Sequence, residues 1–355
     1  MRPIPHRLNA ALAAFFCLGA CLDAATATET VPAGDARVAR MGRMADTADG
    51  AVRFAYPGVS LFLRFEGRTL ALDAASTGEK SWLDVIVDGT VRTLHVAPEG
   101  ARHVLVDAAQ PGLHTVQVLH RSETWHGTVT LRGFTTDGRF APAPSLPARR
   151  LMFLGDSVTC GEALERSPPG PKQPVWWNPR LSYGMLAGAA LRAQVHLVCH
   201  GGRGLVRSWN GRTDEFNLAR LYELALADPA RPEPWDQRRY APDLIVSAIG
   251  TNDFNQGIPE RAAYVGEYVA LVRTLLRDHP RARIVLTEGA ILDGEKKTAL
   301  RAYIDETIRR VGDARVSSAV SRHYPGDAVD AHPTRAQHAA MAADLVPQLR
   351  AAMGW

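Results

Sequence analysis

The sequence of 355 residues lacks several features that would point to particular classes of protein. Its 41 lysines and arginines nearly balance 37 aspartates and glutamates, and no long basic cluster occurs, so nucleic-acid binding gets little support. The four cysteines show no CxxC spacing and no zinc pattern. No internal repeat or low-complexity tract is visible. What is present is ordinary globular composition, 46% hydrophobic and 22% charged, in a length that allows two domains.

Metal-ligand spacing is also absent. His323, His332 and His338 do not stand at i,i+4 positions, so we expect no metal site. Nothing else in the sequence calls for a cofactor.

The N-terminus predicts an export signal over residues 1–27. Arg2 and Arg7 flank the start of a mostly apolar run to Ala20 that is too short to span a membrane comfortably. Two cleavage sites compete. Ala25-Thr-Ala27 fits the small-x-small pattern of signal peptidase, whereas Leu18-Gly-Ala-Cys21 resembles a bacterial lipobox, the interpretation we slightly prefer. The protein is therefore expected to be exported, periplasmic or secreted, with a lipid anchor if Cys21 is modified.

Residues 35–138 predict an all-β domain, a sandwich or jelly roll. Short β-rich runs alternate with turn signals, among them Gly67-Arg68 and Pro111-Gly112. Residues 139–150 contain three prolines and predict a semi-rigid linker.

Residues 151–355 predict an α/β domain with a parallel sheet covered by helices. The strand-like runs are Leu151–Leu154, Val195–Cys199, Leu244–Ile249 and Ile284–Thr287. The helix-like segments are Leu181–Arg192, Phe216–Ala227, Arg261–Asp278, Lys297–Val311 and Arg335–Met353. Thr334 and Gln337 form a capping box for the last helix, and Pro347 inside it is expected to kink it.

The most informative stretch is Phe153-Leu-Gly-Asp-Ser-Val-Thr-Cys-Gly161. Its apolar start stops at Gly155-Asp156, so Ser157 follows a short buried strand at the sheet edge where α/β proteins bind ligands. A serine there is a candidate nucleophile if a base lies within reach.

Asp330-Ala-His332-Pro333 supplies a candidate base. Pro333 disfavours helix at His332, so this histidine lies in an extended loop before the last helix. Asp330 is close enough for its carboxylate to reach Nδ1 and orient the imidazole. Taken alone, such a pair more often merely decorates a loop.

Two further strand ends supply candidate oxyanion donors. Gly202, in Cys199-His-Gly-Gly-Arg-Gly204, offers a backbone N–H that a ligand can approach closely. Asn252, in Gly250-Thr-Asn-Asp253, offers a side-chain amide. Each segment alone reads as an ordinary turn.

Together these four segments, in this order, resemble the SGNH (GDSL) hydrolase superfamily over residues 150–355. The resemblance implies Ser157 as nucleophile, His332 as base oriented by Asp330, and Ser157, Gly202 and Asn252 as oxyanion donors. Most members place the aspartate three residues before the histidine, whereas here the spacing is two. A dyad of Ser157 and His332 is therefore the alternative to a triad.

A β-sandwich ahead of such a domain, Thr159-Cys-Gly161 after the serine, and Asp-x-His-Pro resemble carbohydrate esterase family two. That resemblance implies an acetylxylan esterase-like enzyme that deacetylates a polysaccharide or oligosaccharide without a cofactor. Trp176, Trp177, Arg203 and Phe254 lie near these motifs and are candidate substrate contacts, although packing roles fit them equally well.

Three alternatives remain open. An α/β-hydrolase elbow would place glycine where Thr159 stands, which makes that fold the weaker interpretation. The same chemistry could act on other small acyl esters, lipid or thioester, although no long apolar lid is evident. A carbohydrate-binding protein without catalysis is the third. The sequence also leaves open whether Cys160 and Cys199 form a disulfide or stay as buried thiols.

Overall fold

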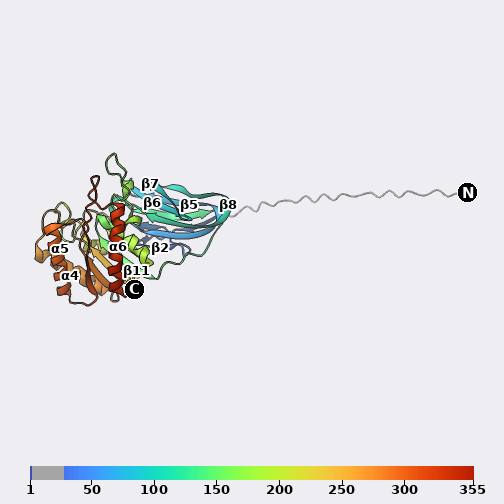
Figure 1. Ribbon diagram of the computed structural model, residues 1–355. Helices are drawn as coiled ribbons and strands as arrows, with labels where there is room; N and C mark the ends of the chain where they lie inside the picture. The colour runs from blue at the N-terminus through green and yellow to red at the C-terminus, as the bar shows by residue number, and fades with distance from the viewer. Residues whose placement is uncertain (2–27) are drawn as a thin grey trace.

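The computed structural model describes Met1 and residues 28–355. The predicted lipobox cysteine Cys21 and the apolar run before it lie outside the described residues. Within residues 28–355 we find no helix both long and apolar enough to cross a membrane. Figure 1 shows a β-rich part beside an α/β part, and this arrangement confirms the predicted fold class.

The β-rich part is an antiparallel sheet of ten strands in the order β3-β4-β9-β5-β8-β6-β7, with β1 paired to β9 and both β2 and β10 paired to β5. The strands are β1 (Glu29–Pro32), β2 (Ala39–Met41), β3 (Ala45–Asp46), β4 (Val52–Phe54), β5 (Ser60–Ser76), β6 (Ser81–Val87), β7 (Thr90–Val96), β8 (Ala101–His120), β9 (Val129–Thr136) and β10 (Arg139–Phe140).

Two of these strands are longer than the sequence predicts. Gly67-Arg68 and Pro111-Gly112 are not turns, because β5 and β8 run through them, and Gly67 lies opposite Gly112 in the ladder. The pairing shifts register between Gly67 and Thr69, as at a β-bulge. Glycine and proline are tolerated in strands at such irregular positions, so the turn signals here mark bulges instead.

The α/β part contains a parallel sheet in the order β12-β11-β15-β16-β17. Its strands are β11 (Arg149–Gly155), β12 (Ala193–Cys199), β15 (Leu244–Ala248), β16 (Arg283–Thr287) and β17 (Val316–Ala319); β13 (Leu224–Leu226) and β14 (Glu233–Pro234) form a separate pair. The helices are α1 (Ser157–Cys160), α2 (Tyr183–Leu191), α3 (Leu218–Tyr222), α4 (Arg261–Asp278), α5 (Gly294–Val311) and α6 (Arg335–Met353).

Two details depart from the predicted elements, whereas the last helix begins as predicted. Phe216–Ala227 is not one helix, because α3 ends at Tyr222 and Leu224–Leu226 pairs with β14 instead. The fifth strand, β17, was not predicted, since only two of its four residues are buried and the segment is short. Helix α6 begins at the predicted capping box and continues through Pro347.

The two faces of the parallel sheet are buried in different ways. Helices α2 and α6 cover one face, where Leu151, Phe153 and Val246 belong to one hydrophobic cluster. On the other face, Met152 and Leu154 belong to a second cluster that also takes in α3, α4, α5 and the core of the β-rich part. This second cluster is therefore a core that the two parts of the chain share.

Buried hydrogen bonds also join the two parts. The Tyr56 hydroxyl donates to the Leu221 carbonyl at 2.7 Å, and the fully buried Arg43 donates through Nη1 to the carbonyls of Tyr222 and Leu224. Burial lowers the pKa of Arg43 to about 10, still well above neutral pH. These hydrogen bonds attach the β-rich part to the end of α3 and the start of β13.

We predict that Tyr56→Phe lowers the free energy of unfolding by about 1 kcal/mol, because the hydrogen bond from its hydroxyl to the Leu221 carbonyl inside the shared core is lost. Urea unfolding followed by tryptophan fluorescence and by circular dichroism measures this change. Both signals are expected to shift together in one transition. Two separate transitions, with only one of them shifted, would contradict a shared core.

Candidate active site

Three neighbouring strands deliver three of the predicted residues to one edge of the sheet. Ser157 follows β11, Gly202 follows β12, and Asn252 follows β15. Because β12, β11 and β15 are adjacent and parallel, their carboxyl ends meet there. The next strand in sequence, β12, lies on one side of β11 and the later strand β15 lies on the other, which makes β11 the point where the strand order switches. His332 comes from the loop before α6.

The turn at the end of β11 fixes the position of Ser157. Asp156 is the N-cap of the four-residue helix α1 and accepts a hydrogen bond from the Val158 N–H at 3.0 Å. Burial raises the pKa of Asp156 to about 6. At Gly155 a β-carbon would stand 2.8 Å from the β-carbon of Thr159 and 3.0 Å from the Ala248 carbonyl oxygen, so the turn requires glycine. Ser157 is thereby held at the first position of α1.

Ser157, His332 and Asp330 form a continuous chain of hydrogen bonds. His332 Nε2 lies 2.9 Å from Ser157 Oγ, and His332 Nδ1 lies 2.6 Å from Asp330 Oδ1. Burial alone would raise the pKa of Asp330, but hydrogen bonds from His332 and Lys172 outweigh it and hold that pKa well below its usual range. These are the contacts that a nucleophile, its base and an orienting carboxylate need.

A local turn explains how the two-residue spacing works. Asp330 Oδ1 also accepts the His332 backbone N–H at 2.9 Å, which is an Asx turn. The same oxygen therefore reaches both the backbone and the ring of His332. Asp327 instead accepts the N–H groups of Val329 and Asp330, so its carboxylate organises the loop and does not meet the imidazole.

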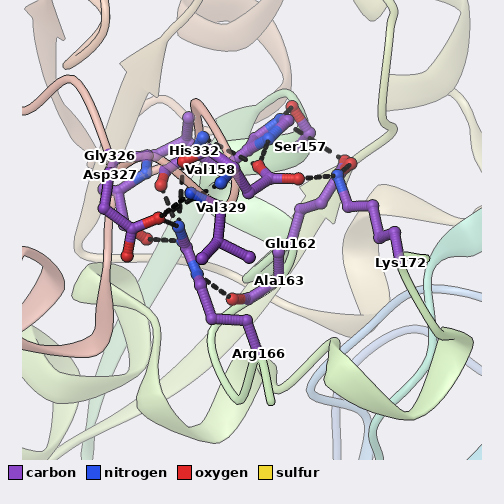
Figure 2. Close-up of polar contacts among 12 residues, drawn as sticks. Ser157, Val158, Glu162, Ala163, Arg166, Lys172, Gly326, Asp327, Val329 and His332 are labelled. Carbon is purple, nitrogen blue, oxygen red and sulfur yellow. Dashed lines mark hydrogen bonds and ion pairs between the residues drawn. The ribbon is translucent and has the colours of Figure 1, made fainter. Parts of the chain in front are cut away.

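The segment after α1 holds this loop in place, as Figure 2 shows. Arg166 donates to the carbonyls of Asp330, His332 and Pro333 at 2.9, 2.7 and 3.1 Å. Lys172 Nζ lies 2.7 Å from Asp330 Oδ2. Sequence reasoning did not identify either residue, and the only available signal was two cations in the polar segment just after the nucleophile.

The candidate oxyanion donors converge beside Ser157. Gly202 has a φ of +75°, a conformation that glycine adopts readily. The Asn252 side-chain amide donates to the Arg203 carbonyl at 2.8 Å, which leaves its second N–H hydrogen for another acceptor. Within residues 28–355, neither the Ser157 nor the Gly202 backbone N–H has a hydrogen-bond acceptor.

Asp253 ties the two donor loops together. Its carboxylate, which follows β15, accepts the backbone N–H groups of Leu205, Val206 and Arg207 after β12. Burial raises the pKa of Asp253, and these hydrogen bonds oppose that shift. Hydrogen bonds with the residues that follow Gly202 thus hold its loop against the loop that carries Asn252.

These residues open into a cavity of about 630 Å³ between the two parts of the chain. Trp125 and Trp209 stand at it with 51% and 54% of their surfaces exposed. Trp125 comes from the short 3-10 helix Thr124–His126 of the β-rich part. The other lining residues are Ser157, Glu162, His200, Gly201, Gly202, Arg203, Thr251, Asn252, Asn255, Ile291, Ala331 and His332.

Of the four substrate contacts predicted from the sequence, one lines the cavity and three do not. Arg203 lines the cavity, with its guanidinium 2.5 Å from Glu215. Trp176 and Trp177 are buried, and Phe254 packs in the core against Tyr264. The structure does not bring these three aromatic residues to the cavity. Trp125 was missed because it lies in the β-rich part, far from the four motifs in sequence, and no sequence pattern singled out Trp209.

Cys160 and Cys199 form a disulfide with a Cα–Cα distance of 5.7 Å. It joins the end of α1 to the end of β12, next to the nucleophile. Among residues 28–355 there is no cluster of three or more histidine, cysteine, aspartate or glutamate side chains able to hold a metal ion.

Comparisons with known proteins agree with both parts of the chain. Residues 40–144 match the family model "Carbohydrate esterase 2 N-terminal", and residues 153–348 match "GDSL-like Lipase/Acylhydrolase family". A Cellvibrio japonicus protein named acetylxylan esterase / glucomannan deacetylase is 51% identical over 332 residues, which cover 93% of each chain.

Solved structures give the same result. A family two carbohydrate esterase from Cellvibrio japonicus superposes with a TM-score of 0.92 at 51% identity, covering 93% of this chain and 99% of that one. One from Clostridium thermocellum, in complex with cellohexaose, superposes with a TM-score of 0.83 at 28% identity, covering 90% and 99%. The chain belongs to the GDSL-like hydrolases and, within them, to carbohydrate esterase family two, so it is a carboxylic ester hydrolase.

Proposed function

We propose that this protein is an exported serine esterase that removes acetyl groups from a carbohydrate through an acetyl-enzyme. The observation that carries the proposal is the hydrogen-bonded chain Asp330–His332–Ser157, which ends in a cavity with two exposed tryptophans. Flat aromatic faces suit sugar rings. A relative named acetylxylan esterase / glucomannan deacetylase supports the substrate class, and the N-terminal sequence supports export, with or without a lipid on Cys21.

In the proposed mechanism, Ser157 Oγ attacks the acetyl carbonyl while His332 Nε2 takes its proton. The negative charge on the carbonyl oxygen is stabilised by the N–H groups of Ser157, Gly202 and Asn252. His332 then returns the proton to the sugar oxygen as the bond to the acetyl carbon breaks. Water hydrolyses the acetyl-enzyme by the reverse proton path and restores Ser157.

The first prediction concerns the substrate. Acetate release from acetylated xylan and acetylated glucomannan is expected to exceed the hydrolysis of longer-chain esters, and Ser157→Ala is expected to abolish both. Acetylated peptidoglycan serves as a third glycan. Binding of these glycans without any acetate release would instead support a non-catalytic carbohydrate-binding protein.

The second prediction concerns the oxyanion. Asn252→Ala is expected to lower kcat for p-nitrophenyl acetate by about 10²–10³-fold, the usual loss for one oxyanion donor. The melting temperature is measured alongside, because Asn252 also bonds to the Arg203 carbonyl. Undiminished turnover would remove Asn252 from the oxyanion site.

The third prediction separates a triad from a dyad. Asp330→Asn is expected to lower kcat by about 10⁴-fold, as for other triad carboxylates, because the amide can no longer stabilise an imidazolium at Nδ1. Asp327→Asn is the matched variant in the same loop, and it should cost less than about tenfold. A loss below about tenfold in Asp330→Asn would favour a dyad.

A further inference from the structure

A second carboxylate, Glu162, faces the catalytic histidine from the opposite side. Its Oε2 lies 3.5 Å from His332 Nε2, the nitrogen that also contacts Ser157 Oγ. Its Oε1 forms an ion pair with Lys172. Glu162 also lines the cavity together with Ser157, so Oε2 is an acceptor directed at the reacting atoms. Figure 2 draws the ion pair of Glu162 with Lys172.

The surroundings of Glu162 keep it in this position. Lys172 bridges it to Asp330, so one cation joins the carboxylates on the two sides of His332. On its other side lies Gly201, where a side-chain β-carbon would stand 3.5 Å from Glu162 Oε2. That distance is ordinary van der Waals contact, so Glu162 packs directly against the loop that carries Gly202.

A neighbouring acid behaves differently from Glu162. Glu123, from the β-rich part, is fully buried, and burial together with the charge of Glu162 raises its pKa to about 8. Glu123 does not line the cavity, whereas Glu162 does. Of the two acids, it is therefore Glu162 that can meet a group entering the site.

We propose that Glu162 orients the water molecule that hydrolyses the acetyl-enzyme, an inference that rests on the acetyl-enzyme mechanism proposed above. Two acceptors 3.5 Å apart, Nε2 and Oε2, allow one water oxygen to lie within hydrogen-bond distance of both. One O–H then points to each acceptor, and a lone pair of the oxygen faces the acetyl carbon on Ser157.

The atoms balance in this step. The O–H directed at His332 gives its proton to Nε2 while the water oxygen bonds to the acetyl carbon. The bond from that carbon to Ser157 Oγ then breaks, and Nε2 returns the proton to Oγ. The second O–H stays on the product, acetic acid, hydrogen-bonded to Glu162 until it leaves.

Only deacylation offers Glu162 a second O–H. In the acylation step the oxygen at this position belongs to the sugar, and a carbon atom replaces the second hydrogen. Glu162 thus assists water and not an alcohol, which favours hydrolysis of the acetyl-enzyme over transfer of the acetyl group to another hydroxyl.

The test is Glu162→Gln. Since Lys172 pairs with Oε1, we expect the amide oxygen to face Lys172 and the NH₂ group to face the cavity, where it cannot accept the water hydrogen. The rate constant for deacetylation, measured by quenched flow on p-nitrophenyl acetate, is expected to fall about 10- to 100-fold, the usual value of a hydrogen bond to a charged group. The value of kcat/KM, which reports acylation, should stay within about threefold.

Two further readouts follow from the same variant. Glu162→Gln should release p-nitrophenol in a burst of one equivalent and carry an acetyl group on Ser157 in intact-protein mass spectrometry. With an added alcohol, the ratio of acetyl transfer to hydrolysis should rise. Glu165→Gln is the matched control, because Glu165 lies in the same segment but pairs with Arg121 at the junction of the two parts.

The outcomes separate the two proposals. If deacetylation is unchanged in Glu162→Gln, or if kcat/KM falls as much as the deacetylation rate, Glu162 does not act on the water and the inference is overturned. If the wild-type enzyme forms no acetyl-enzyme, or Ser157→Ala remains active, the mechanism under Proposed function fails instead.

Discussion

The active site depends on the hydrogen bonds that hold the loop carrying His332 against the carboxyl end of β11. Ser157 is positioned by the sheet itself, because the turn after β11 leaves it little freedom. His332 has no strand beneath it and lies in an irregular stretch between β17 and α6. Three carbonyls of that stretch accept hydrogen bonds from Arg166, whose side chain is 7% exposed. The 2.9 Å contact between the serine and the histidine therefore requires this arginine to stay in place.

The β-rich part contributes to the site as well as to the core. Trp125 reaches the cavity, and the neighbouring Thr124 hydroxyl donates to the Cys199 carbonyl at 2.7 Å, at the end of β12. The loop that carries Gly202 begins immediately after that carbonyl. Because the two parts share a hydrophobic cluster, movement of one relative to the other would disturb both the tryptophan and the oxyanion loop.

Much of the site could be predicted from the sequence because residues that directly follow buried parallel strands gather at one edge of the sheet. Ser157, Gly202 and Asn252 each follow an apolar run, and parallel strands bring such positions to one edge. Trp125, Glu162 and Lys172 could not be found in this way, since contacts between distant loops leave no periodic pattern. The expected substrate contacts at Trp176, Trp177 and Phe254 rested on nearness in sequence, but these residues are buried. In the β-rich part, glycine and proline marked bulges in β5 and β8 where turns were expected.

The spacing of Asp330 and His332 shows how a departure from a family pattern can keep its chemistry. Because His332 stands two residues after Asp330, its backbone N–H closes an Asx turn onto the Asp330 carboxylate, and the same carboxylate oxygen contacts Nδ1. Its second oxygen is left for Lys172, which also pairs with Glu162. Because Lys172 attracts both carboxylates, the position of Asp330 at Nδ1 of His332 is linked to the position of Glu162 near Nε2. The segment from Glu162 to Lys172 thus sets the geometry on both sides of the base, although it supplies neither the nucleophile nor the base.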